Sequence, residues 1–368
     1  MKVVMTGGGT AGHVNPALSI AQIIKDKEPS SVIEFIGTKD RLEATLVPKA
    51  GYKLHTIEVY GLKRSLSLEN VKIMYKAYRS FVECKRLLKQ IAPDAVIGTG
   101  GYVSWPVCRA AASLGIPTFL HEANAHPGFA VKMLDGKADV IFVNFKETMQ
   151  LLKSKKTSKI HVGMPIDGQF YTLDKKCARE MIGADGYKHM VLSFGGSLGA
   201  KRINDTILSV LSSYAIRHPE IYFLHASGGR SYSDALESFK ELGLDKFSNI
   251  KLCDYIYDMP MQMAAADVVI SRSGASTMSE LAALGKPSIL IPSPNVTNDQ
   301  QTKNAKVFAD KGGAVLIPDG ELDAKALESE LEKLFTDKAY LDDMAKTAKS
   351  FSVENTSEII YKTVKERI

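Results

Sequence analysis

Cysteine and tryptophan are scarce in this sequence, which has four Cys and one Trp among 368 residues. The cysteines stand 24, 69 and 76 residues apart, so they form no CxxC pair, and no histidine lies near them at metal-ligand spacing. These absences argue against a zinc module and against a disulfide scaffold. We expect four reduced, mostly buried thiols at Cys84, Cys108, Cys177 and Cys253.

Long hydrophobic runs are also missing. The most apolar long window, Val103–Leu120, contains two prolines, a glycine and Arg109, and no window offers the roughly 20 uninterrupted apolar residues of a membrane-spanning helix. The amino terminus passes from Lys2 through a short apolar segment into glycines, without the apolar core of a signal peptide. We therefore expect a cytoplasmic protein whose membrane contacts are at most peripheral.

Neither sign of charge is concentrated in one place. Lys and Arg number 47 and Asp and Glu 41, a net charge of +6, and no run of five like charges occurs. This pattern disfavours a nucleic-acid-binding tail and a nucleic-acid partner. There is also no Asp-x-Asp motif, and hence no obvious carboxylate pair to hold a divalent metal on a diphosphate. We expect no metal and no other cofactor.

What the sequence does contain is an alternation of short β-branched segments and longer segments of helical periodicity. This alternation predicts parallel sheets covered by helices, which is an α/β fold. The predicted strands are Val3–Thr6, Val32–Gly37, Ala95–Thr99, Thr118–His121 and Val140–Val143 in the first half, and Met190–Phe194, Ile221–Leu224, Val268–Ser271 and Ser288–Ile291 in the second.

The strand, glycine turn and helix start of residues 3–12 recur 188 residues later, at 191–200. This repeat predicts two α/β domains of similar construction, divided near a stretch with glycines and a proline at 163–169. We place the first domain at residues 1–163 and the second at 164–351. The last segment, 352–368, has helical spacing, and we expect it to pack back on the first domain.

Three glycine turns follow predicted strands and are candidate ligand loops. They are GGGTAG at 7–12, GTGGYVSWP at 98–106 and GGSLGA at 195–200. In open parallel sheets such loops form the ligand crevice, and amides at a helix start favour phosphate. An NAD enzyme is disfavoured, because the second strand ends at Gly37 without the ribose-binding carboxylate. Turns needed only for folding remain the alternative.

His13 follows the first glycine turn at the predicted start of a helix. The helix end there disfavours a protonated imidazole, so a neutral His13 could act as a general base. A purely structural histidine fits the same pattern.

In the second half, SRSGASTMSE at 271–280 joins helix-start amides around Ser276 to Arg272, both suited to a diphosphate. Glu280 further along could accept ribose hydroxyls or simply lie on a solvated face. The amide side chains of NDQQTKN at 298–304 suit sugar hydroxyls, although loops commonly carry them.

Residues 67–91 have the periodicity of an amphipathic helix with basic residues beside its apolar stripe. Such a helix either lies on anionic lipid or packs against the core with a basic outer face. The stripe comprises Val71, Met74, Tyr75, Tyr78, Phe81 and Val82.

Six motifs occur in order over nearly the whole chain: GGGTAGHVNPAL, GTGGYVSWP, HEANAHPG, GGSLGAKRIN, RSGASTMSELAALGKPSILIPSP and DQQTKNA. Together they resemble the MurG family of N-acetylglucosaminyltransferases, which complete the lipid-linked peptidoglycan precursor. The resemblance implies a GT-B fold, in which two Rossmann-like domains face each other across a cleft that holds the donor.

The resemblance further implies an inverting transfer of N-acetylglucosamine from UDP-N-acetylglucosamine to the C4 hydroxyl of undecaprenyl-diphospho-N-acetylmuramoyl-peptide. It implies a peripheral enzyme at the cytoplasmic face of the bacterial plasma membrane. An anionic membrane surface and other cell-wall synthesis proteins are the further partners that it implies.

The resemblance implies the following residue roles, several of which the motifs above already suggest. His13 is the candidate base. The candidate acceptor-binding residues are Gly9, Thr10, Gly100, Gly101 and Tyr102. The candidate donor-binding residues are Thr10, Ala11, Gly12, Asn124, Ser197, Ile256, Arg272, Ser276, Glu280, Gln300 and Gln301, with the backbone of Ile256 on uracil and the Glu280 carboxylate on ribose.

The chain departs from the family pattern after the last strand of the first domain. The family commonly has GNP followed by a hydrophobic residue and an arginine that contacts the donor, whereas this chain has GMPID, with Met164 and Asp167. Three alternatives stay open, the last of them because of this change. They are a transferase for another lipid acceptor such as diacylglycerol, a UDP-N-acetylglucosamine 2-epimerase, and a catalytically inactive nucleotide-sugar-binding protein.

Overall fold

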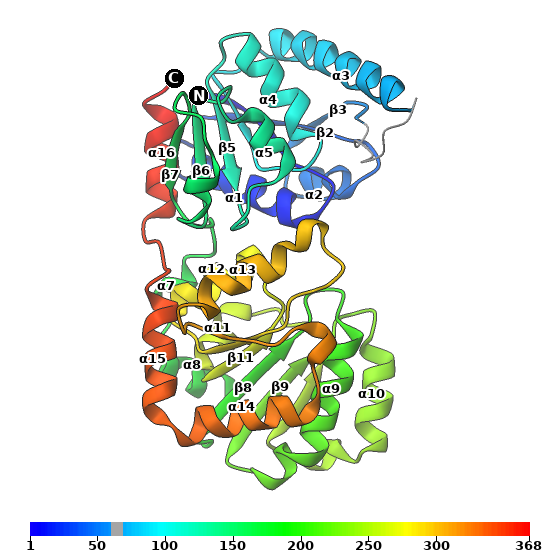
Figure 1. Ribbon diagram of the computed structural model, residues 1–368, viewed down its shortest axis with the longest axis vertical. Coiled ribbons are helices and arrows are strands. Elements are labelled where there is room, and N and C mark those ends of the chain that lie inside the picture. The colour runs from blue at the N-terminus through cyan, green and yellow to red at the C-terminus, as the bar shows by residue number, and fades with distance from the viewer. Residues whose placement is uncertain (60–68) are drawn as a thin grey trace. The chain divides into compact units, whose positions relative to one another are not determined.

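The computed structural model describes the backbone of residues 1–59 and 69–368 and the side chains of residues 1–59 and 78–368. The chain forms two compact units (Figure 1). The N-terminal unit comprises Met1–Pro165 and Val353–Ile368, and the C-terminal unit comprises Ile166–Ser352. Each unit has its own parallel sheet with helices on both faces.

The N-terminal unit has a seven-stranded parallel sheet in the part of the chain described, in the order β3-β2-β1-β4-β5-β6-β7. The strand order reverses between β1 and β4, so the loops after these strands lie at the switch point where such sheets bind ligands. The strands are β1 (Lys2–Thr6), β2 (Val32–Gly37), β3 (Lys53–Thr56), β4 (Ala95–Gly98), β5 (Thr118–Glu122), β6 (Val140–Val143) and β7 (Ser158–His161). The helices are α1 (Ala11–Lys27), α2 (Leu42–Lys49), α3 (Glu69–Ile91), α4 (Ser104–Ser113), α5 (Phe129–Leu134), α6 (Thr148–Leu151) and α16 (Thr356–Lys365).

The C-terminal unit repeats this topology in a six-stranded parallel sheet, β10-β9-β8-β11-β12-β13, with its switch point between β8 and β11. The strands are β8 (His189–Phe194), β9 (Ile221–Ala226), β10 (Ile250–Cys253), β11 (Val268–Ser271), β12 (Ser288–Leu290) and β13 (Val315–Leu316). The α-helices are α7 (Gln169–Thr172), α8 (Lys175–Ile182), α9 (Lys201–Ser213), α10 (Tyr232–Glu241), α11 (Met259–Ala265), α12 (Ala275–Leu284), α13 (Gln300–Ala309), α14 (Ala324–Thr336) and α15 (Lys338–Lys349). Short 3-10 turns lie at η1 (Ala215–Arg217), η2 (Leu244–Lys246), η3 (Thr297–Asp299) and η4 (Asp319–Glu321).

The predicted α/β class is confirmed, and every predicted strand overlaps an observed one. The sequence did not predict β3, β7, β10 and β13, which are the edge strands of the two sheets. They are only partly buried, and β7 has the sequence SKIH with each residue half-buried. An edge strand has a neighbour on one side only, so it lacks the continuous apolar run that marks a central parallel strand.

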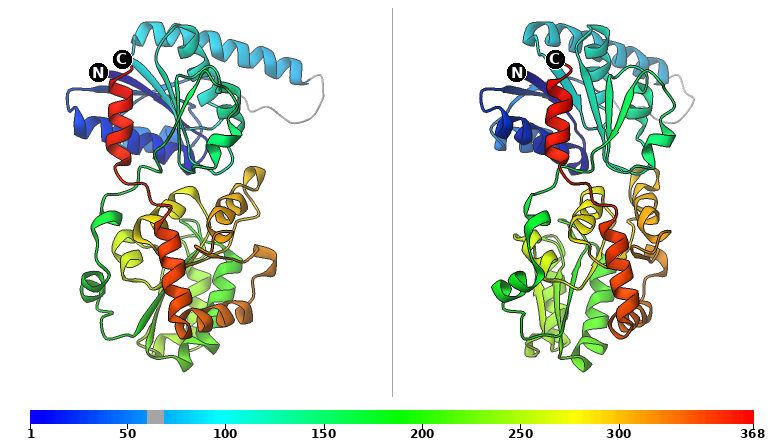
Figure 2. Two further views of the ribbon diagram at one scale, coloured as in Figure 1. Left: turned by 60° about the vertical axis from the view of Figure 1, so that its left-hand side comes forward. Right: turned by 90° about the vertical axis from the view of Figure 1, so that its left-hand side faces the viewer.

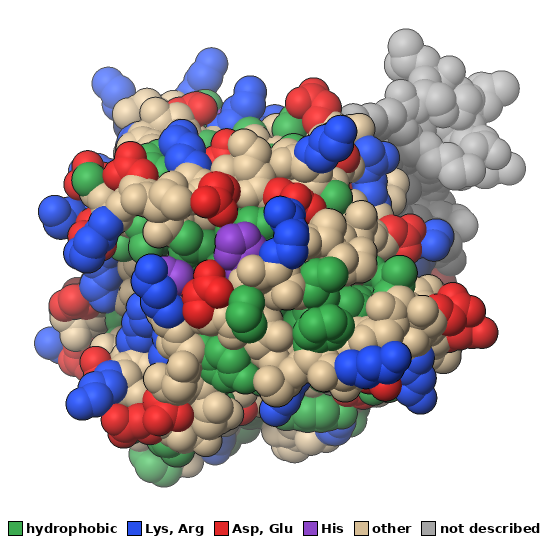
Figure 3. Space-filling view, turned by 90° about the horizontal axis from the view of Figure 1, so that it is seen from below, with side chains coloured by type: hydrophobic (Ala, Val, Ile, Leu, Met, Phe, Trp, Pro, Cys, Tyr) green, Lys and Arg blue, Asp and Glu red, His purple; other side chains and the backbone are tan. Residues whose placement is uncertain are grey.

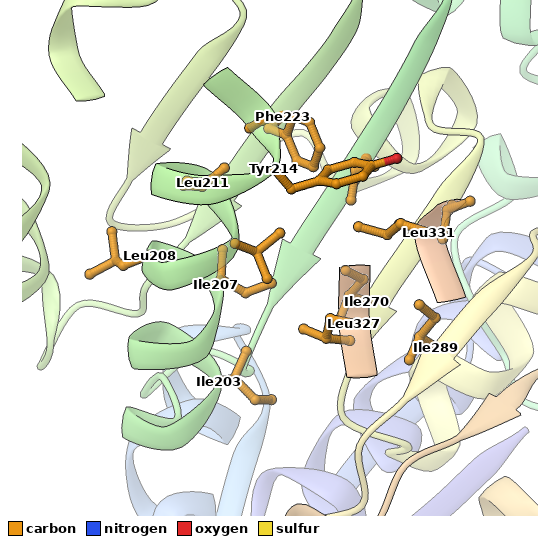
Figure 4. Close-up of a cluster of buried hydrophobic side chains, with 14 of the residues drawn as sticks. Ile203, Ile207, Leu208, Leu211, Tyr214, Phe223, Ile270, Ile289, Leu327 and Leu331 are labelled. Atoms are coloured by element: carbon orange, nitrogen blue, oxygen red, sulfur yellow. The ribbon is translucent and has the colours of Figure 1, made fainter. Parts of the chain in front are cut away.

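The cores lie on both faces of each sheet because alternate strand residues point to opposite faces. In the N-terminal unit, Val3 and Met5 pack with α1, while Val4 packs on the other face with the buried Cys84 of α3 and Cys108 of α4. In the C-terminal unit, α9 and α14 enclose one face of the sheet with the side chains shown in Figure 4. All four cysteines are free thiols, of which Cys177 is exposed and Cys253 half-buried.

Helix α16 packs beside α1 of the N-terminal unit (Figure 2). Its apolar side is fully buried at Ile360 and Val364. The polar side holds the end of α1, where Lys365 Nζ lies 2.8 Å from Glu28 Oε2 and Lys27 Nζ lies 2.5 Å from Glu358 Oε2. The last residues of the chain therefore complete the first unit.

Charges of both signs are interspersed on the face drawn in Figure 3, with hydrophobic side chains between them. On the helices of the C-terminal unit, neighbouring charges pair one turn apart, as in Lys201 with Asp205 and Lys338 with Asp342. Such exposed pairs contribute little stability each and mainly keep the surface solvated.

Candidate active site

The glycine loops after β1 and β4 lie directly against each other in the N-terminal unit. A Cβ on Gly101 would stand 2.3 Å from the carbonyl oxygen of Gly8, and one on Gly100 would stand 2.7 Å from Cδ2 of His13. The backbones of Gly9, Gly100 and Gly101 also have positive φ, so these close approaches require glycine. The loops thus bring together the predicted residues Gly9, Thr10, His13, Gly100, Gly101 and Tyr102.

His13 lies on the first turn of α1, and its imidazole is held by the loop before it. Nδ1 is 3.2 Å from the carbonyl oxygen of Gly8 and 3.2 Å from Thr10 Oγ1. Because a carbonyl can only accept, Nδ1 carries the proton and Nε2 carries the lone pair. Burial lowers the pKa of His13, while the Gly8 hydrogen bond and the charge of Glu43 act in the opposite direction. The imidazole is therefore neutral at neutral pH, with a basic Nε2.

The start of α1 presents free amides. Thr10, the N-cap residue, is extended and makes no side-chain capping bond. Thr10, Ala11 and Gly12 are all exposed. Because the first N–H groups of a helix lack partners within it, these amides can receive an anion.

A buried carboxylate lies beneath the first glycine loop. Glu43 is 1 % exposed, and its Oε2 accepts a 2.9 Å hydrogen bond from the backbone N–H of Gly9. Its Oε1 accepts from both the N–H and the hydroxyl of Thr38, at 3.1 and 2.6 Å. Sequence reasoning missed Glu43, because an acidic residue in the first turn of a helix is ordinary and nothing in the sequence shows that it points inward.

In the C-terminal unit, the loop after β8 packs against the loop after β9. A Cβ on Gly199 would stand 2.0 Å from the carbonyl oxygen of Ser227, and one on Gly228 would stand 2.1 Å from the amide nitrogen of Gly199. Ser197, at the tip of the first of these loops, is exposed. The glycine pair at 228–229 follows a predicted strand and is a signal that the sequence reasoning passed over.

A series of hydrogen bonds between uncharged side chains connects β8 to the loop after β9. The fully buried His225 places Nδ1 2.9 Å from Ser193 Oγ and Nε2 3.2 Å from Asn204 Oδ1. Asn204 in turn donates from Nδ2 to the carbonyl oxygen of Ser227 at 2.9 Å. Burial lowers the pKa of His225 to about 4, so this histidine stays neutral and links β8 to the loop after β9.

Helix α12 places Ser276 and Glu280 on one face, because they stand one turn apart. Ser276 lies in the first turn, where the amide groups are free of helical partners. Burial raises the pKa of Glu280 to about 7. No described residue hydrogen-bonds to its carboxyl group, so both oxygens are available to a ligand that donates hydrogen bonds.

Arg272 does not have the free guanidinium that the sequence suggested. Its Nη1 donates to the carbonyl oxygens of Ile291 and Pro292, both at 3.0 Å, and lies 2.6 Å from Asp319 Oδ1. This arginine links the strand ends to η4. Its role as a diphosphate contact stays a prediction. The pairing with Asp319, distant in sequence, could not be seen from the motif.

The two glutamines of α13 differ in what holds them. Gln301 Oε1 accepts a 2.8 Å hydrogen bond from the amide of Ser293, and the Gln301 carbonyl accepts from Ser273 Oγ at 2.8 Å. Gln300 starts the helix and is half-buried. The loop after β11 and the start of α13 are therefore fixed to each other, which keeps the predicted amide cluster near the switch point of this sheet.

Two further predicted donor residues lie in loops. Ile256 is 7 % exposed and follows β10. Asn124 follows β5 in the N-terminal unit and donates from its backbone N–H to Glu122 Oε1 at 3.0 Å. Glu122 also accepts from the amide of Gly128 at 2.7 Å, so this carboxylate organises the whole loop.

The residues that depart from the family pattern have local roles here. Met164 is buried. Asp167 is exposed, and its Oδ1 accepts a 2.9 Å hydrogen bond from the backbone N–H of Gln169 at the start of α7.

Only part of the predicted lipid-facing stripe lies within the described side chains. The side chains of Val71, Met74 and Tyr75 lie outside the described residues. Tyr78 is 64 % exposed. Phe81 instead packs on the core, with Lys85 Nζ 5.6 Å and the Arg109 guanidinium 5.9 Å from its ring centre.

Within the described residues, no cluster of three or more His, Cys, Asp or Glu side chains has the arrangement of a metal site. None of the described helices combines the length and the apolar character needed to cross a membrane.

Both sheets thus have glycine loops and free helix amides at their switch points, which defines a protein built from two nucleotide-binding-type α/β domains. Residues 3–143 match the glycosyltransferase family 28 N-terminal domain, and residues 190–360 match the glycosyltransferase family 28 C-terminal domain. The chain belongs to glycosyltransferase family 28.

The relatives match over their full length. A protein of Acetivibrio thermocellus, named UDP-N-acetylglucosamine–N-acetylmuramyl-(pentapeptide) pyrophosphoryl-undecaprenol N-acetylglucosamine transferase, is 40% identical over 100% of this chain and 98% of its own. A protein of Desulforamulus reducens with the same name is 39% identical over 98% and 97%. The crystal structure of MurG from Acinetobacter baumannii matches with a TM-score of 0.79 and 27% identity over 99% of both chains. A UDP-N-acetylglucosamine 2-epimerase from Neisseria meningitidis, with a TM-score of 0.67 and 17% identity over 100% of both chains, shares the fold alone.

The predicted GT-B architecture and the prediction of a hexosyltransferase are therefore confirmed.

Proposed function

We propose that this chain transfers N-acetylglucosamine from UDP-N-acetylglucosamine to the C4 hydroxyl of the muramoyl sugar of undecaprenyl-diphospho-muramoyl-peptide, converting lipid I to lipid II. The observation that carries the proposal is the 40% identity, over the whole chain, to relatives named for this reaction. The transfer inverts the anomeric carbon, as expected for a single direct displacement.

His13 is the general base in this proposal. The acceptor hydroxyl attacks the anomeric carbon, its proton passes to Nε2 of His13, and the bond from the anomeric carbon to the diphosphate oxygen breaks as UDP leaves. The geometry supports this role, because Nδ1 is committed to the Gly8 carbonyl and Nε2 has no partner among the described residues. A lowered pKa keeps the imidazole in its basic form at neutral pH.

The other predicted residues divide between the two substrates. The amides of Gly9, Thr10, Gly100 and Gly101, with Tyr102, receive the acceptor diphosphate. Helix-start amides near Ser276 and the loop at Ser197 hold the donor diphosphate and stabilise the departing UDP without a metal. Ile256 contacts uracil, Glu280 the ribose hydroxyls, and Gln300, Gln301 and Asn124 the sugar, with Ala11 and Gly12 as further donor contacts.

The enzyme acts at the cytoplasmic face of the membrane in this proposal, since its acceptor is a lipid. The exposed Tyr78, together with Lys85 and Arg109 around the neighbouring ring of Phe81, supports contact with an anionic surface. Other cell-wall synthesis proteins are further proposed partners.

The product distinguishes this proposal from its alternatives. Purified protein is incubated with UDP-N-acetylglucosamine and a short-chain analogue of the acceptor, and the lipid product is analysed by mass spectrometry and proton NMR. We expect one added N-acetylhexosamine in β linkage. Formation of UDP-N-acetylmannosamine without acceptor would instead identify an epimerase, and donor binding without any product would identify an inactive binding protein.

A further inference from the structure

Glu43 is a buried carboxylate that the proposed reaction does not yet use. Its three hydrogen-bond donors are the Gly9 amide and the two donors of Thr38, so both carboxylate oxygens are occupied. No Lys or Arg among the described side chains forms an ion pair with it. A buried carboxylate without a cation is costly, and it persists where its hydrogen bonds organise something.

The backbone around Glu43 is adapted to admit it. A Cβ on Gly8 would stand 2.4 Å from Glu43 Oε1, and one on Gly37 would stand 2.8 Å from Glu43 Cγ. Two glycines, one in the loop after β1 and one at the end of β2, thus leave room for this one side chain. A glutamate that only complemented the dipole of α2 could lie in solvent and would need neither glycine.

One peptide group connects Glu43 to His13. The carbonyl of Gly8 and the N–H of Gly9 belong to the same planar peptide unit. Its carbonyl oxygen accepts from Nδ1–H of His13 at 3.2 Å, and its N–H donates to Glu43 Oε2 at 2.9 Å. Hydrogen bonds in such a chain polarise one another, so the carboxylate makes the Gly8 carbonyl a stronger acceptor.

We infer that Glu43 is a positioning residue for His13, which it orients and supports through the Gly8–Gly9 peptide. The inference rests on the proposed role of His13 as base. The arrangement serves the purpose that a carboxylate next to a catalytic histidine serves elsewhere, with a peptide group inserted between them. It fixes the Nδ1–H tautomer, leaves Nε2 free for the proton, and stabilises the imidazolium that forms when the proton arrives.

The electrostatics around His13 agree with this geometry. Glu43 is the charged residue whose field raises the pKa of His13, against the effect of burial. From the second glycine loop, Tyr102 is the titratable side chain that meets the first loop. The charges that α16 brings to α1, Glu358 and Lys365, pair with Lys27 and Glu28 at the far end of that helix.

The test is the pH profile of Glu43→Gln. A glutamine fills the same space, but its NH₂ group cannot accept, so it cannot serve all three donors. We expect kcat to fall about 10- to 100-fold, by analogy with the loss when the partner that orients a metal-ligating histidine is removed. The acidic limb of kcat/KM should move to lower pH, since His13 loses the charge that raises its pKa, while KM for UDP-N-acetylglucosamine stays within about twofold.

A double-mutant cycle separates this inference from failure of the proposed base. If Glu43 acts through His13, Glu43→Gln adds little further loss in a His13→Ala background. If His13→Ala sharply lowers kcat and the two losses simply multiply, Glu43 is a structural residue and the inference is wrong. If His13→Ala alone leaves kcat within about threefold, the proposed base is wrong instead.

Glu28→Gln is the matched control, because Glu28 is another hydrogen-bonded carboxylate of the same unit, held by Lys365 and the amino terminus. It should lower the melting temperature without moving the acidic limb. A shift of the limb in both variants would show that the pH profile reports stability, which would overturn the inference.

Discussion

The two units share a topology, but the histidines beside their glycine loops differ in their hydrogen bonds. In the N-terminal unit, His13 donates from Nδ1 to a loop carbonyl and keeps Nε2 free. In the C-terminal unit, His225 has both ring nitrogens in hydrogen bonds, to Ser193 and Asn204, and burial lowers its pKa to about 4. The first histidine can therefore take up a proton, whereas the second can only hold its loops in place.

The carboxylates show the reverse arrangement. Glu43 of the N-terminal unit has its oxygens filled by backbone and hydroxyl donors, whereas Glu280 of the C-terminal unit has no donor among the described residues and a pKa raised to about 7. The N-terminal carboxylate is thus engaged by the fold, whereas the oxygens of the C-terminal one are not hydrogen-bonded within the described residues. In the proposed function, the N-terminal unit supplies the base and the C-terminal unit holds the donor.

The largest effect is expected from removing the imidazole of His13, the N-terminal histidine of this comparison. His13→Ala should lower kcat about 100-fold or more, the usual contribution of a general base, and leave the affinity for UDP-N-acetylglucosamine unchanged. Initial rates and calorimetric titration of the donor measure the two quantities. His218→Ala, in the other unit and outside the glycine loops, is the control and should keep wild-type turnover.

The second prediction concerns Glu280. Ribose hydroxyls donate hydrogen bonds, so they favour the ionised carboxylate, and donor affinity should rise as pH increases through about 7. Glu280→Gln should bind UDP-N-acetylglucosamine about tenfold or more weakly, because hydrogen bonds to a charged acceptor are the stronger ones. Its affinity should also vary little with pH. Calorimetry at several pH values would contradict the assignment if wild type and variant showed the same slope.

His225→Phe should act on the C-terminal unit alone. The substitution removes the imidazole from Ser193 Oγ and from Asn204 Oδ1 and should cost about 1–3 kcal/mol in the free energy of unfolding. The loop at Ser227 loses support, so KM for the donor should rise, whereas the acidic limb of kcat/KM should stay where it is. A shifted limb would show that this histidine takes part in the proton transfer.

The smallest effects are expected on helix α3. Tyr78→Glu should weaken binding to anionic vesicles with little change in melting temperature, because the side chain is 64 % exposed. Phe81→Glu should instead lower the melting temperature, since Phe81 packs on the core. Vesicle sedimentation and thermal unfolding measure the two outcomes. Unchanged vesicle binding of Tyr78→Glu would exclude this side chain from the membrane contact.

The sequence predicted the central strands and the glycine loops because both have local signals. Central parallel strands are apolar throughout, and a glycine turn before a helix can be recognised by itself. Edge strands such as β3 and β13 have no such signal, because half of their surroundings is solvent. Their pairing is visible only in the folded sheet.

The residues of the candidate site divide in the same way. His13 and Ser276 could be found from their positions at helix starts. Glu43 could not, because its role depends on contacts with Gly9 and Thr38 made by folding. Arg272 shows the same limit, since the motif suggested a phosphate contact but did not show the ion pair with Asp319. Long-range polar pairing is what a local motif does not contain.

The most direct test of the account is UDP release by the purified protein given UDP-N-acetylglucosamine, with and without the short-chain muramoyl-peptide acceptor. We predict rapid release that requires the acceptor and is lost in His13→Ala. Donor binding without acceptor-dependent release in the wild-type protein would contradict the account, and would direct attention to Asp167 at the start of α7.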